Sequence, residues 1–594
     1  MANVVTNDMS IVIGGDAGQG VESSGAGFCL SFARAGLHVF GMQDYRSRIR
    51  GGHNFYQIRL SERPRYSHSN PVHVLIALTP ESVALHLDNI AEGGAVVFPE
   101  RFEIDEKPLL ERGVRVDALP LMKIAEEHGS RVMTNTAALG ATAAICGFPI
   151  DYMERVIRDN FAKKGQQTID ANIEVAREAY GLAENQYGDF PFKLSPVQDA
   201  PKRMLMTGNE AFAMGALAAG CRFISAYPMT PATSIIEWLS QLPPEYGVVT
   251  KHAEDEIAAA CMAIGASFAG ARAMTATSGG GFCLMVEAMG LAGMTEVPLV
   301  IVESQRGGPS TGLPTRTEQS DLLFVINASH GESPRIVTAP GTVEECFEAG
   351  WRSFNLAERY QCPVIVLVDQ FLSSSLRTLD MDGIDFSHVE IDRGPTLGPE
   401  ELDKIAEEYR RFELTESGVS PRAVLGHPKG VIVASSDEHD ETGHINEEID
   451  NRRRMMAKRM RKLEAAEEEM RPPVRYGPET ADVTLVCWGS TFGPCREAAD
   501  EINESGGSAN VVQFVDLWPL PEEQVAEALS ACRWTVVVEQ NYTAQLAKLL
   551  RMAAGIEVDA TMTKYDGRPF APEEIVAGLP GPFGEQEVPS GHEA

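Results

Sequence analysis

Residues 254–281 read EDEIAAACMAIGASFAGARAMTATSGGG and carry the clearest structural signal in the chain. Three carboxylates open a run of small residues, which predicts a tightly packed helix with acids at its N-terminus. The apolar stretch 273–277 predicts a buried strand, and the glycines that follow it predict a turn. A small-residue helix that leads into such a strand is typical of an α/β sheet.

Similar units recur along the chain. Strands are expected at 11–13, 72–78, 94–98, before 226, and at 297–303, 363–369, 483–488, 509–514 and 534–539. Helices lie between them, and this alternation predicts doubly wound parallel sheets. The polar stretch 189–202 predicts a linker, and the pattern becomes irregular and highly charged between 380 and 482. There, residues 447–470 predict a solvated helix with some i,i+4 charge pairs.

The charge balance restricts the kind of partner. The 594 residues predict roughly three or four domains. They include 84 Asp+Glu against 51 Lys+Arg, which gives a net charge of -33. Such a field repels phosphate backbones, so nucleic acid is not expected as a partner. Only 13 of the 51 basic residues are Lys. An acidic surface poor in lysine favours adaptation to high salt, where screening removes self-repulsion, over a merely acidic cytosolic protein.

Targeting and cysteine signals point to a cytoplasmic protein. No basic region precedes a long apolar run at the N-terminus, so no secretory signal is expected. No window is long and apolar enough for a membrane helix. The ten cysteines form no CxxC pair and are spread evenly. We therefore expect neither a disulfide framework nor an iron–sulfur cluster held by this chain.

Two features near the N-terminus leave alternatives open. The glycine turn at 14–20 is placed to cradle an anion, but Asp16 and the irregular spacing make turn packing without a ligand equally plausible. Arg46, Arg48 and Arg50 form an isolated basic cluster ahead of Gly51-Gly52-His53. It fits an anion site or an interface, and the interface is slightly favoured.

The turn Tyr227-Pro228-Met229-Thr230-Pro231 follows an expected strand. Ligands of doubly wound sheets bind beyond the carboxyl ends of the strands, so Thr230 is placed to present its hydroxyl there. The alternative is a helix start, with Thr230 as N-cap and Pro231 at the first position. Both interpretations can hold together.

A carboxylate at the start of the helix after Asp255 is a candidate for proton chemistry. If it is drawn into the packed face, it can share a proton with a ring nitrogen. Spacing alone does not decide between Glu256 and Glu254. Stabilisation of the helix dipole is the alternative role for these acids.

The stretch 303–321 delivers Arg306 and Arg316 among Ser, Thr and Gly residues after a buried strand. Because a guanidinium offers a bidentate fork, this arrangement predicts a site for a carboxylate or phosphate. A flexible loop with surface arginines is the second interpretation.

These motifs together resemble the alpha subunit of 2-oxoacid:ferredoxin oxidoreductases, which are thiamine-diphosphate enzymes. The matching stretches are YPMTP (227–231), residues 254–281 and QRGGPSTGLPTRTEQSD (305–321). VDLWPLP (515–521), VVVEQNYTAQL (536–546) and YDGRPF (565–570) are similar to the family's transketolase-C-like domain. GGDAGQG (14–20) and RGGHN (50–54) are similar to its gamma component, here fused ahead of alpha.

The resemblance implies a multi-domain α/β fold. Its parts are a gamma-type α/β domain (1–190), a thiamine-diphosphate pyrimidine-binding α/β domain (203–380), a charged connecting region (381–480), a transketolase-C-like α/β domain (481–578) and a tail (579–594).

The resemblance also implies roles for individual residues. Glu256 would hydrogen-bond the aminopyrimidine of thiamine diphosphate and promote the tautomer that deprotonates the thiazolium. Thr230 and Arg306 would contact the substrate or the reacting centre, and Arg316 would bind substrate. The cofactor would be bound by Glu256 together with Tyr227, Pro228, Thr277 and Ser278.

A GDG motif followed by Asn, the usual diphosphate–Mg²⁺ signature, is missing, because Tyr565 precedes Asp566-Gly567. The implied enzyme is therefore active only with a beta subunit that carries the diphosphate site, Mg²⁺ and an iron–sulfur cluster. CoA would be the co-substrate, ferredoxin the electron acceptor and a heterotetramer the assembly.

The substrate is the least determined part. Arg316 could hold a second carboxylate, which favours 2-oxoglutarate over pyruvate, or it could pair with Glu318. An indolepyruvate-type or 2-oxoisovalerate-type oxidoreductase subunit and a non-catalytic scaffold subunit of the same fold are the alternatives.

Overall fold

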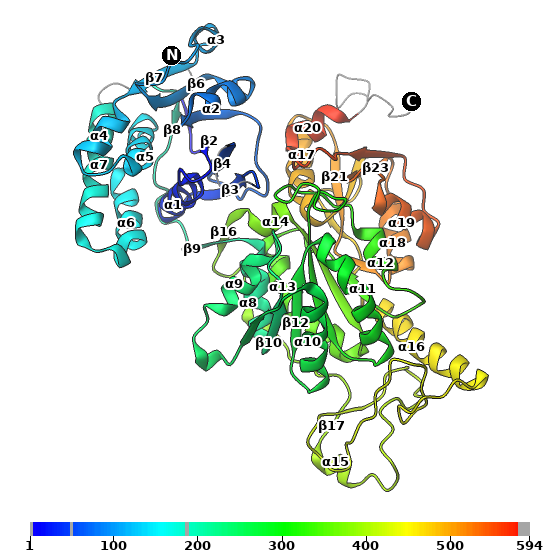
Figure 1. Ribbon diagram of the computed structural model, residues 1–594. Helices are drawn as coiled ribbons and strands as arrows, with labels where there is room; N and C mark the ends of the chain where they lie inside the picture. The colour runs from blue at the N-terminus through cyan, green and yellow to red at the C-terminus, as the bar shows by residue number, and fades with distance from the viewer. Residues whose placement is uncertain (1–3, 48–51, 185–188, 580–594) are drawn as a thin grey trace. The chain divides into compact units, whose positions relative to one another are not determined.

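The computed structural model describes residues 4–47, 52–184 and 189–579. The chain divides into two compact units. The first comprises the residues up to 207 with 374–384 and 571–574, and the second comprises 208–373, 385–570 and the residues from 575 onward. Both are α/β structures (Figure 1).

The first unit contains an eight-stranded mixed sheet in the order β7-β6-β5-β2-β4-β3-β16-β9. Its strands are β2 (Met9–Asp16), β3 (His38–Asp44), β4 (His53–Ser61), β5 (Val72–Ala77), β6 (Ile90–Pro99), β7 (Arg115–Leu119), β9 (Arg203–Met206) and β16 (Leu376–Asp380). The parallel pairing that we expected holds for β2, β5, β6 and β7. It is wrong for β3, β4, β9 and β16, which pair antiparallel. Strands β3 and β4 follow one another too closely for a crossover helix, which parallel pairing would need. A two-stranded sheet joins β1 (Val5–Thr6) and β8 (Phe192–Lys193).

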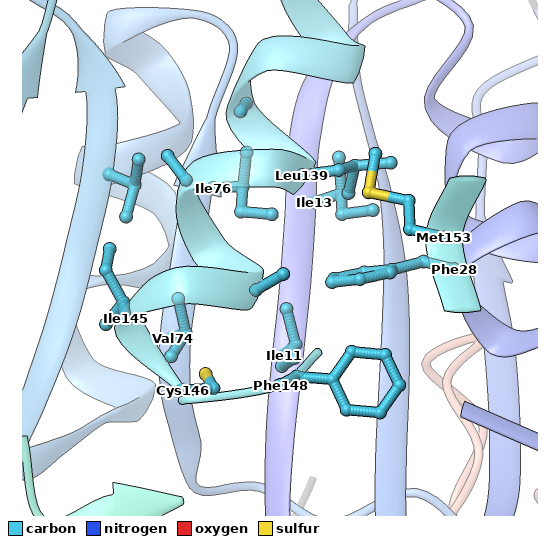
Figure 2. Close-up of a cluster of buried hydrophobic side chains, with 14 of the residues drawn as sticks. Ile11, Ile13, Phe28, Val74, Ile76, Leu139, Ile145, Cys146, Phe148 and Met153 are labelled. Carbon is cyan, nitrogen blue, oxygen red and sulfur yellow. The ribbon is translucent and has the colours of Figure 1, made fainter. Parts of the chain in front are cut away.

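The helices of this unit are α1 (Val21–Arg34), α2 (Pro80–His86), α3 (Lys107–Glu111), α4 (Leu121–Glu127), α5 (Thr134–Ile145), α6 (Ile150–Phe161) and α7 (Gln166–Glu184). Figure 2 shows the core, where Ile11 of β2 and Val74 of β5 lie beneath α5 and near Phe28 of α1. Helix α5 is built mostly of small residues. Its Gly140 lies so close to the backbone of Ala176 in α7 that no larger side chain fits there.

The second unit contains a seven-stranded sheet in the order β11-β10-β12-β13-β15-β14-β22. The strands are β10 (Phe223–Ala226), β11 (Val249–His252), β12 (Ala273–Thr277), β13 (Leu299–Gln305), β14 (Ile336–Thr338), β15 (Pro363–Asp369) and β22 (Asp516–Trp518). All pair in parallel except β22, which is antiparallel to β14. The carboxyl ends of β10, β12 and β13 therefore meet at one edge of the sheet, where the candidate site lies.

The helices around this sheet are α8 (Gly208–Ala218), α9 (Thr233–Ser240), α10 (Glu256–Phe268), α11 (Gly279–Met294), α12 (Leu322–Asn327), α13 (Val343–Tyr360) and α14 (Gln370–Ser374). Helix α9 begins at Thr233, with Ala232 as its N-cap residue. The interpretation of Thr230 as an N-cap is therefore wrong, because the turn continues past Pro231 before the helix starts.

A five-stranded sheet in the order β19-β21-β20-β23-β24 follows. Its strands are β19 (Val474–Tyr476), β20 (Val483–Trp488), β21 (Ala509–Phe514), β23 (Thr535–Glu539) and β24 (Ala560–Thr563). The helices in this part of the sequence are α17 (Phe492–Glu504), α18 (Glu522–Ser530), α19 (Gln545–Ala554) and α20 (Pro572–Gly578). Because β22 leaves this block to join the seven-stranded sheet, the VDLWP stretch ties the two sheets together.

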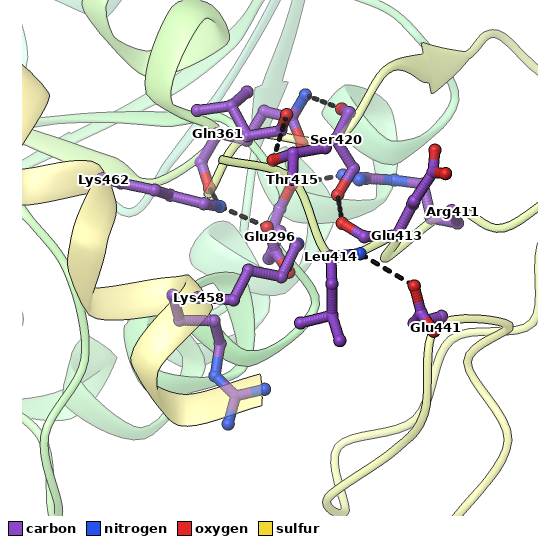
Figure 3. A network of polar contacts seen from close by, with 12 residues as sticks. Glu296, Gln361, Arg411, Glu413, Leu414, Thr415, Ser420, Glu441, Lys458 and Lys462 are labelled. Atoms are coloured by element: carbon purple, nitrogen blue, oxygen red, sulfur yellow. Dashed lines mark hydrogen bonds and ion pairs between the residues drawn. The ribbon is translucent and has the colours of Figure 1, made fainter. Parts of the chain in front are cut away.

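The irregular stretch between 381 and 473 contains β17 (Thr396–Leu397), α15 (Pro399–Asp403), β18 (Arg422–Ala423) and α16 (Ile449–Glu469). A wholly solvated helix is wrong for α16, since Lys458 and Lys462 are fully buried. Both ammonium groups pair with the buried carboxylate of Glu296, with 2.6 Å from Lys458 Nζ to Glu296 Oε1 (Figure 3). Burial lowers the pKa of Lys458 to about 7.

No described helix is long and apolar enough to cross a membrane. No three His, Cys, Asp or Glu side chains among the described residues are grouped so as to hold a metal ion. All ten cysteines are free thiols, and most of them are buried.

Candidate functional site

Glu256 is the first residue of α10 and points into the packed interior. Its side chain is 3% exposed, whereas Glu254 is exposed. Asp255 caps the helix, because its carboxylate accepts a hydrogen bond from the Ala258 N–H at 2.7 Å. No group in the described residues hydrogen-bonds to Glu256 Oε1. A buried carboxylate oxygen without a partner is costly, so an external donor fits at this point.

A glycine cradle faces this carboxylate. Helix α11 begins at Gly279, directly after β12 and Ser278. A Cβ atom on Gly281 would lie 2.7 Å from Glu256 Oε1 and would also collide with the Thr277 hydroxyl. The Ser278 hydroxyl is buried and has no hydrogen-bond partner among the described residues. Glu256 and Thr277 thus pack closely against Gly281, where only a glycine fits, while Glu256 Oε1 and the Ser278 hydroxyl are left to bind an external polar group.

The turn after β10 lies beside the first arginine. Tyr227 is 40% exposed, Pro228 is exposed and Thr230 is half-buried. The guanidinium of Arg306 donates a hydrogen bond from Nη1 to the backbone oxygen of Thr230 at 2.7 Å. The side chain of Asn209 donates to the backbone oxygen of Pro231 at 2.9 Å, which anchors the turn. Thr230 and Arg306, which the resemblance paired at the reacting centre, are therefore neighbours.

The loop between β13 and α12 folds back on itself, so that Arg316 lies next to Gly307 at the start of the loop. The Gly307 N–H donates to the Arg316 oxygen at 3.2 Å, and the Leu313 N–H donates to the Gly307 oxygen at 2.7 Å. Residue Gly312 has φ +49, and a Cβ there would collide with the Gly307 carbonyl. The hairpin therefore places the half-buried residues Arg306 and Arg316 at its two ends.

Two further acids at this edge of the sheet, Glu303 and Asp321, were not predicted from the sequence as site residues. Glu303, near the end of β13, is fully buried close to the Asp321 carboxylate, and Asp321 packs against Gly279. Burial and then the Asp321 charge raise the pKa of Glu303 well above its usual range, and burial raises the pKa of Asp321 to about 6. Burial thus disfavours the charged form of both acids. The position of Asp321, directly before an apolar run, was the available signal.

An exposed apolar face adjoins the cradle on α10 and α11. Ile257, Met262 and Leu284 are 50%, 38% and 49% exposed, and Cys261 and Cys283 are exposed as well. A helix that is apolar on all sides is normally covered on all sides. These exposed apolar side chains make the face a candidate protein interaction surface.

The N-terminal glycine turn lies in the first unit. Gln19 fixes its shape, because its side chain accepts a hydrogen bond from the Asp16 N–H at 2.8 Å and its backbone oxygen accepts one from Asn135. The turn borders a cavity of about 790 Å³ whose lining includes Arg131 and Lys164. Of the basic cluster, Arg46 is exposed, whereas Arg48 and Arg50 lie outside the described residues.

Comparison with known families gives three matches. Residues 10–182 match "Pyruvate ferredoxin/flavodoxin oxidoreductase", residues 214–458 match "Pyruvate flavodoxin/ferredoxin oxidoreductase, thiamine diP-bdg", and residues 481–575 match "Pyruvate:ferredoxin oxidoreductase core domain II".

Individual relatives cover most of the chain. The 2-oxoacid:ferredoxin oxidoreductase 2, subunit alpha, of Aeropyrum pernix is 35% identical over 96% of this chain and 97% of its own length. The 2-oxoglutarate synthase subunit KorA of Methanothermobacter thermautotrophicus is 36% identical over 62% of this chain and 96% of its own. Among solved structures, the 2-oxoglutarate:ferredoxin oxidoreductase from Magnetococcus marinus with 2-oxoglutarate, coenzyme A and succinyl-CoA bound has 35% identity and a TM-score of 0.89, covering 96% of this chain and 98% of that one.

Proposed function

Since the chain belongs to the alpha subunits of the 2-oxoacid:ferredoxin oxidoreductases, we propose that it forms the active site for CoA-dependent oxidative decarboxylation of 2-oxoglutarate. The products are succinyl-CoA and CO₂, and the two electrons released pass to ferredoxin. The observation that carries the proposal is the buried Glu256 carboxylate, whose Oε1 has no partner among the described residues and faces the Gly281 cradle.

Glu256 is proposed to bind the aminopyrimidine of thiamine diphosphate. Bound there, the cofactor supplies the carbon nucleophile and the electron sink for decarboxylation. Glu256 would hold a proton at a ring nitrogen, and the exclusion of water from its 3% exposed side chain strengthens that contact. Thr277 and Ser278 would place their hydroxyls at the ring edge, and Tyr227 and Pro228 would border it.

The two arginines support 2-oxoglutarate as the substrate. Arg306 lies against the Thr230 carbonyl, where it would orient the 2-oxoacid end of the substrate together with Thr230. Arg316, at the other end of the same hairpin, would bind the distal carboxylate. A monocarboxylic acid such as pyruvate has no group for this second guanidinium. The naming of KorA and of the Magnetococcus marinus enzyme for 2-oxoglutarate agrees with this assignment.

The apolar face of α10 and α11 is proposed as the docking surface for a beta subunit. Because this face adjoins Glu256, a partner seated on Ile257, Met262 and Leu284 would complete the cofactor site. The beta subunit would supply the diphosphate site, Mg²⁺ and an iron–sulfur cluster, and ferredoxin would take up the electrons there. We place the enzyme in the cytoplasm as a heterotetramer.

The acidic surface is proposed to be an adaptation to high salt. With a net charge of -33, self-repulsion is strong at low ionic strength and screened at high ionic strength. Unfolding temperature should therefore rise steeply between 0.1 M and 2 M KCl. An unchanged unfolding temperature would contradict this part of the proposal.

The test of function is a 2-oxoacid panel on the complex purified with its partner. The complex is supplied with CoA and ferredoxin, and ferredoxin reduction is followed with 2-oxoglutarate, pyruvate, 2-oxoisovalerate and indolepyruvate. We expect the highest kcat/KM for 2-oxoglutarate. A higher value for another acid would contradict the substrate, and no reduction with any acid would contradict the catalytic assignment and favour a scaffold subunit.

A further inference from the structure

Gly567 of the YDGRPF stretch lies against the stem of Arg316. Its φ is +76, and a Cβ there would lie 2.9 Å from Arg316 Cβ and 2.9 Å from Leu313 Cδ1. A Cβ is normally not tolerated at such distances, so either Gly567 or the arginine would have to move. The backbone conformation also favours glycine. The last α/β block therefore packs against the aliphatic part of the Arg316 side chain.

The last α/β block also holds the loop that carries Arg316, at Gln319, by hydrogen bonds. The Gln319 N–H donates to the Gln540 oxygen at 2.7 Å, and the Gln540 N–H donates to Gln319 Oε1 at 3.0 Å. The Gln319 side chain also donates to the Trp488 oxygen at 2.7 Å, and the Asn541 side chain donates to the Gln319 oxygen at 3.0 Å. All four residues are buried, so these hydrogen bonds fix the loop without competition from water.

Arg306 is held by a different part of the chain. Its guanidinium donates to the Thr230 oxygen, which belongs to the turn after β10 and not to the last block. A change at Gly567 therefore acts directly on Arg316, whereas Arg306 is reached only through the hairpin hydrogen bonds of Gly307.

We propose that Gly567 and the Gln319–Gln540 contact are positioning residues, which set the place of the Arg316 guanidinium and so determine selectivity for a 2-oxodicarboxylate. This inference rests on the proposed function, in which Arg316 binds the distal carboxylate. Bidentate pairing tolerates little displacement, and a supporting shift of about 1 Å is enough to lose it. The YDGRPF and EQN stretches thereby gain a role in substrate choice.

The first test is Gly567→Ala in the intact complex. We expect KM for 2-oxoglutarate to rise about 10- to 100-fold, the range for a lost charged hydrogen bond, with kcat and the KM for CoA unchanged. Gly555→Ala is the matched control, because Gly555 has φ +67 in the same block and no atom within 4 Å of an added Cβ. It carries the same backbone strain and should leave every constant unchanged.

Gln319→Leu provides a second variant, should Gly567→Ala fail to fold. It removes both side-chain hydrogen bonds and leaves the backbone contact with Gln540 possible. The same selective rise in KM for 2-oxoglutarate is expected. An equal rise in KM for 2-oxoglutarate and for CoA in either folded variant would overturn the inference, as that result indicates a general loss of structure.

Arg316→Ala separates this inference from the proposed function. We expect it to abolish the preference for 2-oxoglutarate over pyruvate, and Gly567→Ala should add nothing in that background. If Arg316→Ala leaves the preference intact, the proposed substrate contact fails and the positioning inference fails with it. If Arg316→Ala removes the preference but Gly567→Ala does not weaken it, only the positioning inference is overturned.

Discussion

The carboxylate of Glu256 on α10 faces Gly281 in the first turn of α11, so closely that one added methyl group would lie 2.7 Å from Oε1. The same methyl would collide with the Thr277 hydroxyl. The start of α11 therefore packs directly against a buried acid and the end of β12, and only glycine fits at this contact. Glu256 Oε1, which has no partner among the described residues, is the physical basis for placing a cofactor nitrogen beside it.

Gly281→Ala tests whether thiamine diphosphate binds where Gly281 approaches Glu256. The added methyl should weaken thiamine diphosphate binding to the complex about 10- to 100-fold, since overpacking costs roughly 1–3 kcal/mol. Equilibrium binding of the cofactor, followed by tryptophan fluorescence, measures it. Gly181→Ala is the control, because an added Cβ in α7 has no atom within 4 Å. Equal affinity of the two variants would mean that the cofactor does not occupy the cradle.

Asp321→Asn tests the carboxyl pair through the pH dependence of stability. Burial raises the pKa of Asp321 to about 6, so the folded chain binds this proton more tightly than the unfolded chain. Stability from this group is thus present at low pH and is lost as the pH rises from about 4 to about 6. Asparagine has no such proton to lose. The free energy of unfolding of Asp321→Asn, relative to wild type, should therefore increase by on the order of 2–3 kcal/mol over that window.

Urea unfolding at each pH measures this difference. Glu303 and Glu318, together with Cys283 and Arg306, are the other ionisable groups acting on the pair, and the variant leaves them in place. The exposed Asp382→Asn variant should follow wild type at every pH. A difference for Asp321→Asn that stays constant between pH 4 and pH 6 would exclude a retained proton at this site.

Glu296→Gln tests the buried charge cluster of α16. Removing the carboxylate leaves the buried ammonium groups of Lys458 and Lys462 without their counter-charge. The free energy of unfolding should fall by about 3–5 kcal/mol at pH 7. The loss should be smaller at pH 9, where Lys458, whose pKa burial lowers to about 7, sheds its proton.

Glu111→Gln is the matched control for that measurement. Glu111 forms an exposed i,i+4 pair with Lys107 at 3.7 Å, and such pairs contribute less than about 1 kcal/mol. Equal effects of the two variants would show that burial of the α16 lysines does not govern stability.

The sequence predicted the strands and small-residue helices well, because their apolar runs and glycine stops are local signals. The span 273–277 is a strand as expected, and the helix after Asp255 begins where the acids indicated. Strands β3 and β4 were not predicted, and so their antiparallel pairing was not predicted either. Lys458 and Lys462 were read as solvated because their partner, Glu296, lies far away in the sequence.

The candidate site was predicted at the level of motifs and not at the level of contacts. The spacing could not choose between Glu254 and Glu256, and burial distinguishes them. The Glu303–Asp321 pair was missed because only burial turns two acids into a proton-sharing pair. The contact of Gly567 with Arg316 joins residues far apart in the chain, and a lone glycine after Asp566 gives no sign of it.

Glu256→Gln, in the complex with its partner, tests whether Glu256 activates a thiamine cofactor. Ferredoxin reduction by 2-oxoglutarate and CoA is measured for Glu256→Gln beside wild type and Glu254→Gln, in which the replaced residue is exposed and lies just ahead of the helix. We predict a loss of at least about 100-fold for Glu256→Gln, the scale of a general acid–base contribution, with the complex still assembled. We predict no change for Glu254→Gln. A rate within a few-fold of wild type for Glu256→Gln would contradict the role of Glu256 in activating the cofactor.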